Sequence, residues 1–314
     1  MDGPGQKSGT LSVVKPRIPL PVSLSDVPFT YTEGRAAGLG RHRLRGGDLD
    51  RPFQGVLLAA NQDSTFIALC RALATKLPDD TFFCGASAAR VMGVPLPSRL
   101  ERSRILHVAV PAPGFPPSGR GIRGHMLQVD ERRVRTWAGL RITSPEQTWC
   151  DLGPVLSIPE LVAAGDYLVH WENPITSADA LAAMVLERRR YRGVVRLRAA
   201  VERLSDRSES AQESALRLLI EDAGLPGLAV NYKIRTSGGY NYRGDLAFPR
   251  KKLIVEYQSV LHETPERIRA DMTRVSRLEA DEYKVIQVNK DDMRDPIELV
   301  SRIRRVHNSR PNFD

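Results

Sequence analysis

The C-terminal third of the chain alternates between apolar positions at helical spacing and apolar runs at strand spacing. Leu216, Leu219 and Ile220 share one helical face and predict an amphipathic helix over residues 210–223, which Gly224 ends. Apolar runs bounded by turn residues then predict three strands, a helix, a fourth strand and a last helix. The strands are expected at 230–234, 242–248, 252–257 and 283–288, and the helices at 265–280 and 296–306.

This order of elements predicts a mixed sheet flanked by helices over residues 205–314. The polar stretch 205–209 comes before it and is expected to be a hinge at a domain boundary. Four apolar residues of the second helix recur at helical spacing and are expected to face the sheet: Ile268, Met272, Val275 and Leu278.

The segment 28–63 has the pattern of a small winged helix-turn-helix. Thr30 and Glu33 have capping-box spacing and predict the start of a short helix. A glycine break separates it from a second short helix, which is basic and covers residues 41–45. A turn into a strand over residues 49–57 is expected to be the wing.

In that design the second helix lies in the major groove and the wing contacts phosphate, which assigns DNA binding to Arg41, Arg43 and Arg45. A basic helical pair with no role in DNA binding fits the same pattern, and both interpretations stay open. Residues 1–27 are rich in Gly, Pro and Ser and are expected to be a disordered leader.

The middle region, residues 64–204, has mixed α/β character. Helical stripes are expected within residues 64–98, a strand at 105–110 with His107 in a structural role, and a basic helical connector at 177–204. Its pattern leaves open whether it folds alone or with the N-terminal unit. The predicted fold class is therefore α+β or α/β, in two or three domains for 314 residues.

The net charge of +9 favours a polyanionic partner such as DNA. Each arginine cluster can equally be a solvated helix face. No apolar run reaches the length of a membrane span and no secretory signal is recognisable, so a cytoplasmic protein without a membrane partner is expected. Three separated cysteines without a CxxC motif are consistent with a reducing compartment and argue against zinc.

Acidic residues in two of the predicted C-terminal strands indicate a metal-dependent nuclease site of the PD-(D/E)XK type. Asp245 lies in one strand, and Glu256 and Gln258 share a face of the next strand because they are two residues apart. Two carboxylates that meet across a strand pair repel one another unless a cation lies between them. Mg²⁺ or Mn²⁺ would suit these oxygen ligands and would polarise a phosphodiester, if the site is catalytic.

Three further side chains are candidates for this site. Glu213 faces the sheet together with Leu216, but Ser210 and Glu213 also form a capping box that needs no function. Gln258 cannot act as a general base, whereas its amide can orient water or phosphate. His262 follows the strand and is a candidate to approach the scissile phosphate, with a structural role as the alternative.

Basic residues around the acids are candidates for phosphate contacts. Asp271 and Arg274 are three apart on one predicted helix, so an ion pair within the helix is the alternative for Arg274. The candidates are Lys251, Lys252, Arg267, Arg269, Arg274 and Arg277.

These residues together resemble a family of bacterial domains related to the Vsr-type very-short-patch repair endonucleases, within the PD-(D/E)XK fold. The resemblance covers about residues 205–306. The stretch from Phe29 towards Leu156 resembles the AbiEi-type antitoxins and regulators. The resemblance to the Vsr-related family is carried by Ser210-x-x-Glu213, Asn231, Asp245-Leu-Ala-Phe-Pro249, Leu253-Ile-Val-Glu256-Tyr257, His262, Asp271-x-x-Arg274 and Leu278.

The resemblance implies a DNA-binding protein with a magnesium-dependent endonuclease domain, in which Asp245 and Glu256 hold the metal. The nuclease-like family usually has Glu-x-Asp-Gly-x-x-His, whereas this chain has Gln258 and Ser259 in place of the acid and the glycine. The alternative is a non-catalytic regulator or antitoxin with a degenerate nuclease fold and a toxin or other protein partner. A third interpretation is an interaction protein whose basic surface serves only solubility.

Overall fold

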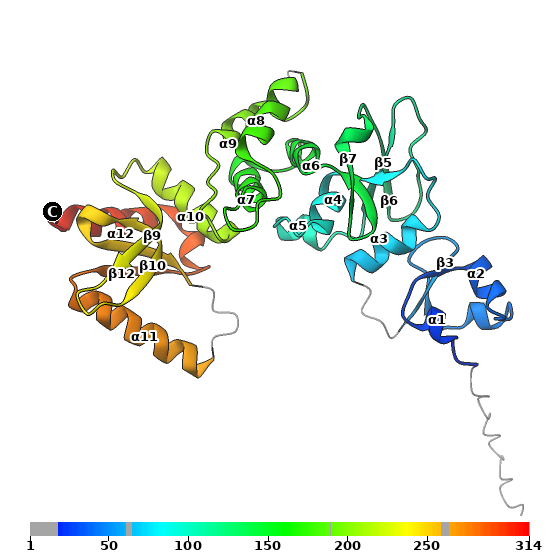
Figure 1. The fold of residues 1–314 in the computed structure, drawn as a ribbon, viewed down its shortest axis with the longest axis horizontal. Coiled ribbons are helices and arrows are strands. Elements are labelled where there is room, and N and C mark those ends of the chain that lie inside the picture. The colour runs from blue at the N-terminus through cyan, green and yellow to red at the C-terminus, as the bar shows by residue number, and fades with distance from the viewer. Residues whose placement is uncertain (1–17, 61–64, 189, 259–263, 314) are drawn as a thin grey trace, which may run out of the picture. The chain divides into compact units, whose positions relative to one another are not determined.

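The structure is a computed structural model that describes residues 18–60, 65–188, 190–258 and 264–313. Its elements are mixed, with helices and several sheets of the α+β class, which confirms the predicted fold class (Figure 1). The chain divides into two compact units. One holds the described part of Met1–Asp80 with Pro117–Ile122, and the other holds Thr81–Pro116 with Arg123–Asp314.

The N-terminal unit contains short helices and a small three-stranded sheet. Its antiparallel sheet has the strand order β1-β3-β2. Thr30 caps α2 in a capping box with Glu33, as predicted. The elements are α1 (Val22–Ser25), β1 (Phe29–Thr30), α2 (Tyr31–Ala36), η1 (Arg43–Arg45), β2 (Leu49–Asp50), β3 (Val56–Ala59) and α3 (Phe66–Ala74).

Two predictions for this unit are wrong. The disordered leader was expected to extend to residue 27, but α1 lies within it, because Leu20 and Leu24 pack into the same core as Phe29. The second helix was expected over residues 41–45, and instead η1 is one turn of 3-10 helix. Its Leu44 is buried in that core, so the turn is shaped by packing as well as by its glycines.

The middle region forms a five-stranded sheet with the order β6-β5-β4-β8-β7, followed by helices. Strand β4 pairs antiparallel with β5 and parallel with β8. The strands are β4 (Phe82–Phe83), β5 (Leu106–Pro111), β6 (Ile122–Leu127), β7 (Val134–Trp137) and β8 (Leu140–Thr143), and the helices are α4 (Gly85–Val91), α5 (Ser98–Glu101), η2 (Glu131–Arg133), α6 (Pro145–Leu152), α7 (Ile158–Leu168), α8 (Ala178–Glu187) and α9 (Val194–Val201).

His107 on β5 is paired with His125 on β6, in agreement with a structural role. Their rings stack, and Nδ1 of His107 lies 3.0 Å from Nε2 of His125. Burial, then the neighbouring His125 and Arg123, lower the pKa of His107 to about 4, and burial followed by Arg123 lowers the pKa of His125. Both rings are therefore held neutral in the folded protein at pH values where a free imidazole begins to protonate.

Acidification is expected to weaken the fold through this pair. In the unfolded chain both imidazoles titrate near a pKa of about 6.5. Between about pH 6.5 and pH 4 the unfolded state therefore binds more protons, and the free energy of unfolding falls. Urea denaturation at several pH values would measure this slope. Replacing His107 and His125 together by Gln is expected to flatten it, and an unchanged slope would contradict the assignment.

The C-terminal region has the predicted order of elements. The sheet order is β12-β11-β10-β9, with β11 and β12 parallel and the other pairs antiparallel. Gly238 and Gly239 lie in the turn between β9 and β10, as expected. The elements are α10 (Ala211–Asp222), β9 (Ala229–Arg235), β10 (Asn241–Phe248), η3 (Pro249–Lys251), β11 (Leu253–Tyr257), α11 (Pro265–Ala280), β12 (Lys284–Val288), η4 (Asp292–Arg294) and α12 (Pro296–Ser309).

The two faces of this sheet are covered differently. Leu216 and Ile220 of α10 and Ile303 of α12 join the core on one face. On the other face Leu278 of α11 is buried, but the prediction that Ile268 and Met272 face the sheet is wrong. Ile268 is 43% exposed and Met272 is 68% exposed, whereas Leu278, near the end of the helix, is fully buried.

The stretch 205–209 does not separate two compact units. Helices α7 and α10 pack against each other across it. The backbone N–H of Ser205 donates to Asp166 at 2.7 Å, and Ser208 is buried. The predicted hinge is therefore part of a packed junction, and the middle and C-terminal regions belong to one unit. Within the described ranges, no helix is long and apolar enough to cross a membrane.

Candidate nuclease-like site

Strands β10 and β11 bring Asp245 and Glu256 to neighbouring positions. In this antiparallel pair Phe248 lies opposite Leu253 and Leu246 lies opposite Val255. The same register places Asp245 next to Glu256. There the Asp245 carboxylate accepts the backbone N–H of Tyr257 at 3.0 Å. At this point the Tyr257 N–H is bonded to a side chain and not to the backbone of β10. The bond holds the Asp245 carboxylate beside the end of β11.

Glu256 is bound by an arginine of the covering helix. The residue is 4% exposed, and both of its carboxylate oxygens accept from the Arg274 guanidinium. Nη1 of Arg274 lies 3.0 Å from Oε1 of Glu256, and Nη2 donates to Oε2. Asp271 also pairs with Arg274, at 3.1 Å. The helical pair proposed from sequence therefore exists, but the buried partner of Arg274 is Glu256.

Asp245 is surrounded by other acids. Burial, followed by the charge of Glu213 and then those of Glu256 and Glu209, raises the pKa of Asp245 to about 7. The hydrogen bond from Tyr257 acts in the opposite direction but is outweighed. Near neutral pH this carboxyl group is thus poised between its neutral and charged forms, as expected for an acid without a nearby cation.

Glu213 serves as a helix cap. Its carboxylate accepts the backbone N–H of Glu209 at 2.9 Å and the hydroxyl of Ser210 at 2.9 Å. Ser210 in turn accepts the backbone N–H of Glu213. Burial raises the pKa of Glu213, and its charge acts on Asp245. The cap by Ser210 is therefore present, but the Glu213 carboxylate bonds the N–H of Glu209 and not that of Ser210, so the capping box is incomplete. Glu213 also contributes to the electrostatics of the site.

Asn231 belongs to the same neighbourhood and was given no role from sequence. It lies in β9 between two residues paired with β10, Val230 opposite Leu246 and Tyr232 opposite Gly244. Its φ is +54°, and Nδ2 donates to Glu209 at 3.3 Å. Its Oδ1 is buried without a partner among the described residues. Asparagine tolerates the left-handed conformation better than most residues, but this conformation is uncommon within a strand. Backbone strain of this kind is concentrated at functional sites.

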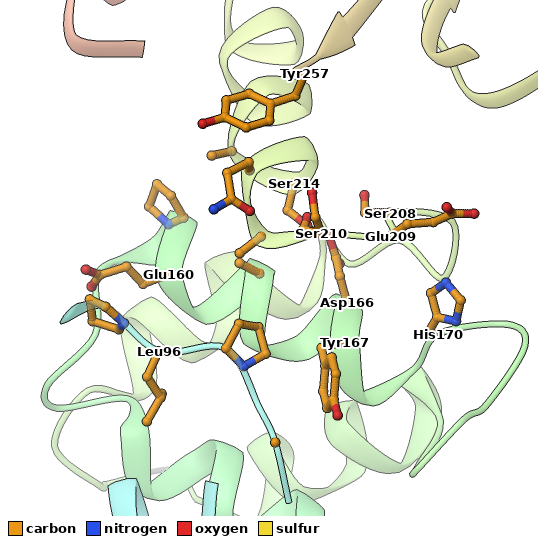
Figure 2. Close-up of a pocket in the computed structure, with 18 of the residues that line it drawn as sticks. Leu96, Glu160, Asp166, Tyr167, His170, Ser208, Glu209, Ser210, Ser214 and Tyr257 are labelled. Carbon is orange, nitrogen blue, oxygen red and sulfur yellow. Dashed lines mark hydrogen bonds between the residues drawn. The ribbon is translucent and has the colours of Figure 1, made fainter. Parts of the chain in front are cut away.

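Gln258 lies at the exit of β11, beside a cavity. Its backbone N–H donates to the carbonyl of Val288 at 2.7 Å. The cavity has a volume of about 1260 Å³ and is lined by helix α7, the start of α10 and the end of β11. Figure 2 shows Tyr257 at one end of it and Tyr167 and His170 at the other. His262, the remaining predicted catalytic residue, lies outside the described residues.

Several predicted phosphate-binding residues are already engaged. Arg43 is buried and pairs with Asp48, so its assignment to a DNA-contacting surface is wrong. Lys251 donates to the backbone carbonyl of Arg310 at 2.8 Å, and Lys252 to that of Asp281 at 3.1 Å. Lys251 thus holds the C-terminal segment and Lys252 the end of α11, so neither ammonium group is simply available to a phosphate. Arg41, Arg45 and Arg267 are exposed, as a DNA contact requires.

The residues that were predicted to hold Mg²⁺ do not form a ready metal site. Among the described residues, no three His, Cys, Asp or Glu side chains are grouped so that they could hold a metal ion. Both oxygens of Glu256 are bonded to Arg274, and Glu213 is bonded to Glu209 and Ser210. The donor set therefore does not fit a bound divalent cation while Arg274 keeps this position.

The chain is similar to two proteins of Mycobacterium tuberculosis. These are the uncharacterized protein Rv2248 of strain ATCC 25618 / H37Rv and the uncharacterized protein MT2308 of strain CDC 1551 / Oshkosh. Each is 28% identical over 265 residues, which cover 84% of this chain and 94% of the relative. No protein-family model matches the sequence.

Among solved structures, the chain is similar to the RV2827C protein from Mycobacterium tuberculosis. The superposition has a TM-score of 0.38 and 20% sequence identity, and covers 56% of this chain and 71% of that chain. A likeness at this level supports no inference about fold or function.

Proposed function

We propose that this chain is a DNA-binding protein of the regulator or antitoxin class, whose C-terminal domain has a nuclease-like fold without hydrolytic activity. The observation that carries the proposal is the bond of Arg274 to both oxygens of Glu256. The guanidinium occupies one lone pair of each oxygen, and its positive charge opposes a metal ion beside the same carboxylate. The amide of Gln258, which stands where the nuclease-like family usually has an acid, supports the same conclusion.

DNA binding is assigned to the N-terminal unit. Helix α2, the turn η1 and the paired strands β2 and β3 follow one another there, and Arg41, just before η1, and Arg45, at its end, are exposed. The net charge of +9 favours association with a polyanion. The proposed contact surface is therefore smaller than the sequence pattern suggested, because Arg43 supports the fold from within.

A second candidate function, a Mg²⁺-dependent endonuclease, is favoured by one observation. Burial and the charges of Glu213, Glu256 and Glu209 raise the pKa of Asp245 to about 7. A cation beside Asp245 would remove this repulsion. Such a metal would supply Lewis-acid activation of a phosphodiester, and Asp245 and Glu256 could hold it only if Arg274 released Glu256.

Replacing Arg41 and Arg45 together by Ala is expected to weaken binding to duplex DNA about tenfold or more and to lower the salt dependence, because two cationic contacts are lost. Fluorescence anisotropy at several salt concentrations measures both quantities. The matched control replaces two other exposed arginines, Arg192 and Arg198, by Ala. An equal loss in both variants would show that only net charge matters and would contradict the assignment.

Plasmid and single-strand cleavage with Mg²⁺ or Mn²⁺ separates the two candidate functions. The proposal expects no cleavage by the wild-type protein. Cleavage that disappears in Asp245→Ala and in Glu256→Ala would establish the endonuclease instead. Cleavage that persists in both purified variants would indicate a contaminant and would leave the non-hydrolytic assignment in place.

A further inference from the structure

A buried polar cluster joins helices α6 and α8 of the middle region, which pack against each other (Figure 1). Gln147 and Asp151 lie on α6, and Arg188 is the C-cap residue of α8. Oδ1 of Asp151 accepts from Nε2 of Gln147 at 2.8 Å and from Nη1 of Arg188 at 3.5 Å. Gln147 and Asp151 share one face of α6 because they are four residues apart. The end of α8 therefore meets α6 at this oxygen.

Each of the three side chains has a second polar atom that is buried without a partner among the described residues. These atoms are Oε1 of Gln147, Oδ2 of Asp151 and Nε of Arg188. Gln147 is 1% exposed, and the side chains of Arg188 and Asp151 are 7% and 13% exposed. Buried polar atoms in folded proteins nearly always have a hydrogen-bond partner, because an unsatisfied one is costly. Three such atoms in one bonded cluster therefore indicate a shared ligand.

The Arg188 guanidinium is held from a second side. It lies over the ring of Tyr191, 4.7 Å from the ring centroid. The backbone N–H of Arg188 donates to the carbonyl of Val185 at 3.1 Å and so fixes the start of the side chain. These contacts restrict the orientation of the guanidinium, so Nε stays in the interior of the cluster.

The charge of Asp151 makes a donor at Oδ2 necessary. Burial raises the pKa of Asp151 to about 6, although Arg188 and the hydrogen bond from Gln147 act in the opposite direction. At neutral pH the carboxyl group is therefore mostly charged, and a buried charged oxygen needs a hydrogen-bond donor. A neutral Asp151 could instead donate from Oδ2 to Oε1 of Gln147, but neither of these atoms has a partner among the described residues.

The ligand has to donate twice and accept once. Oε1 of Gln147 and Oδ2 of Asp151 are acceptors, whereas Nε of Arg188 is a donor. A metal ion or an ammonium group has no lone pair for the arginine N–H, and a halide ion has no hydrogen for the two oxygens. Water has two O–H donors and two lone pairs, and a buried water typically makes about three hydrogen bonds.

We propose that this cluster binds one internal water molecule, which donates to Oδ2 of Asp151 and Oε1 of Gln147 and accepts from Nε of Arg188. The water bridges α6 and the end of α8, and it completes the hydrogen bonding of the carboxylate that joins them. The three side chains lie outside both the N-terminal unit and the nuclease-like site. The water site therefore does not depend on DNA binding or cleavage.

A high-resolution crystal structure of the full chain tests the proposal directly. The expected result is one ordered water within hydrogen-bond distance of all three atoms. A protein donor bonded to Oδ2 of Asp151, or no density between the three atoms, would overturn the proposal. This measurement needs no variant, so it decides the question even where a substitution prevents folding.

Oxygen-17 magnetic relaxation dispersion counts long-lived internal waters in solution and provides a second test. Gln147→Met is expected to lose one such water, because methionine has a similar length but no amide oxygen to accept its hydrogen. Gln212→Met replaces an exposed glutamine of α10 and is the matched control, which should keep the wild-type number. An equal number in folded Gln147→Met and in the wild type would contradict the proposal.

Discussion

Asp166→Ala is expected to lower the free energy of unfolding by about 3–5 kcal/mol, because it removes the buried counter-charge of Arg217 and leaves only the partly exposed Glu221 to pair with it. The side chains of Asp166 on α7 and Arg217 on α10 are 1% and 3% exposed. They are 2.9 Å apart, and Asp166 also accepts from Ser214 at 2.7 Å and from the backbone of Ser205 at 2.7 Å. One substitution therefore breaks every bond of this carboxylate.

The same pair is costly to bury, which makes its loss on one side especially damaging. Burial raises the pKa of Asp166, although Arg217 and the hydrogen bonds act in the opposite direction. Replacing both partners by apolar residues, Asp166→Leu with Arg217→Met, is thus expected to destabilise less than Asp166→Ala alone. Such a result would show that the main role of the pair is to fix how α7 and α10 pack together, and that it adds little to the stability of the fold.

Urea denaturation of the full chain measures these differences. The matched control is Asp291→Ala, which breaks an exposed pair with Arg294 and is expected to change the free energy by about 0–1 kcal/mol. The buried-pair argument would be wrong if Asp166→Ala changed the stability no more than this control.

Gly193→Ala is also expected to destabilise the protein strongly, by lowering the free energy of unfolding by about 2–5 kcal/mol. Gly193 caps the start of α9 with a φ of +87°, a conformation that strains any residue with a Cβ atom. An added Cβ would also lie 2.4 Å from the backbone carbon of Gly153 and 2.6 Å from the nitrogen of Pro154. Backbone atoms cannot rotate away, so helices α6 and α9 would have to separate.

Gly224→Ala is the control that separates these two causes. Gly224 has a similar φ of +67°, but an added Cβ would meet nothing within 4 Å. Its substitution is therefore expected to cost only the backbone strain, about 1–2 kcal/mol. Thermal or urea unfolding of the two variants gives the comparison, and equal losses would remove the close approach at Gly193 as a cause.

The sequence alone determined the order of the C-terminal elements. The helical spacing of Leu216 and Ile220, the strand spacing around Val255 and the glycines at 238 and 239 are local properties, and the structure has each element where they predict it. The capping residues Thr30 and Ser210 were also recognisable, because a cap depends on residues three apart. The adjacency of Asp245 and Glu256 follows from the same local pattern, since a short turn sets the strand register.

Only the tertiary structure decided which charges are free. Arg274 pairs with a residue 18 positions away, Asp166 with one 51 positions away, and Lys251 bonds to a carbonyl 59 positions away. A charged side chain can pair with many partners, and no local periodicity states which partner the packing of α11, α10 or the C-terminal segment will bring near. The sequence therefore indicated an acid pair suited to a metal, whereas the packing of α11 on the sheet placed a guanidinium on it.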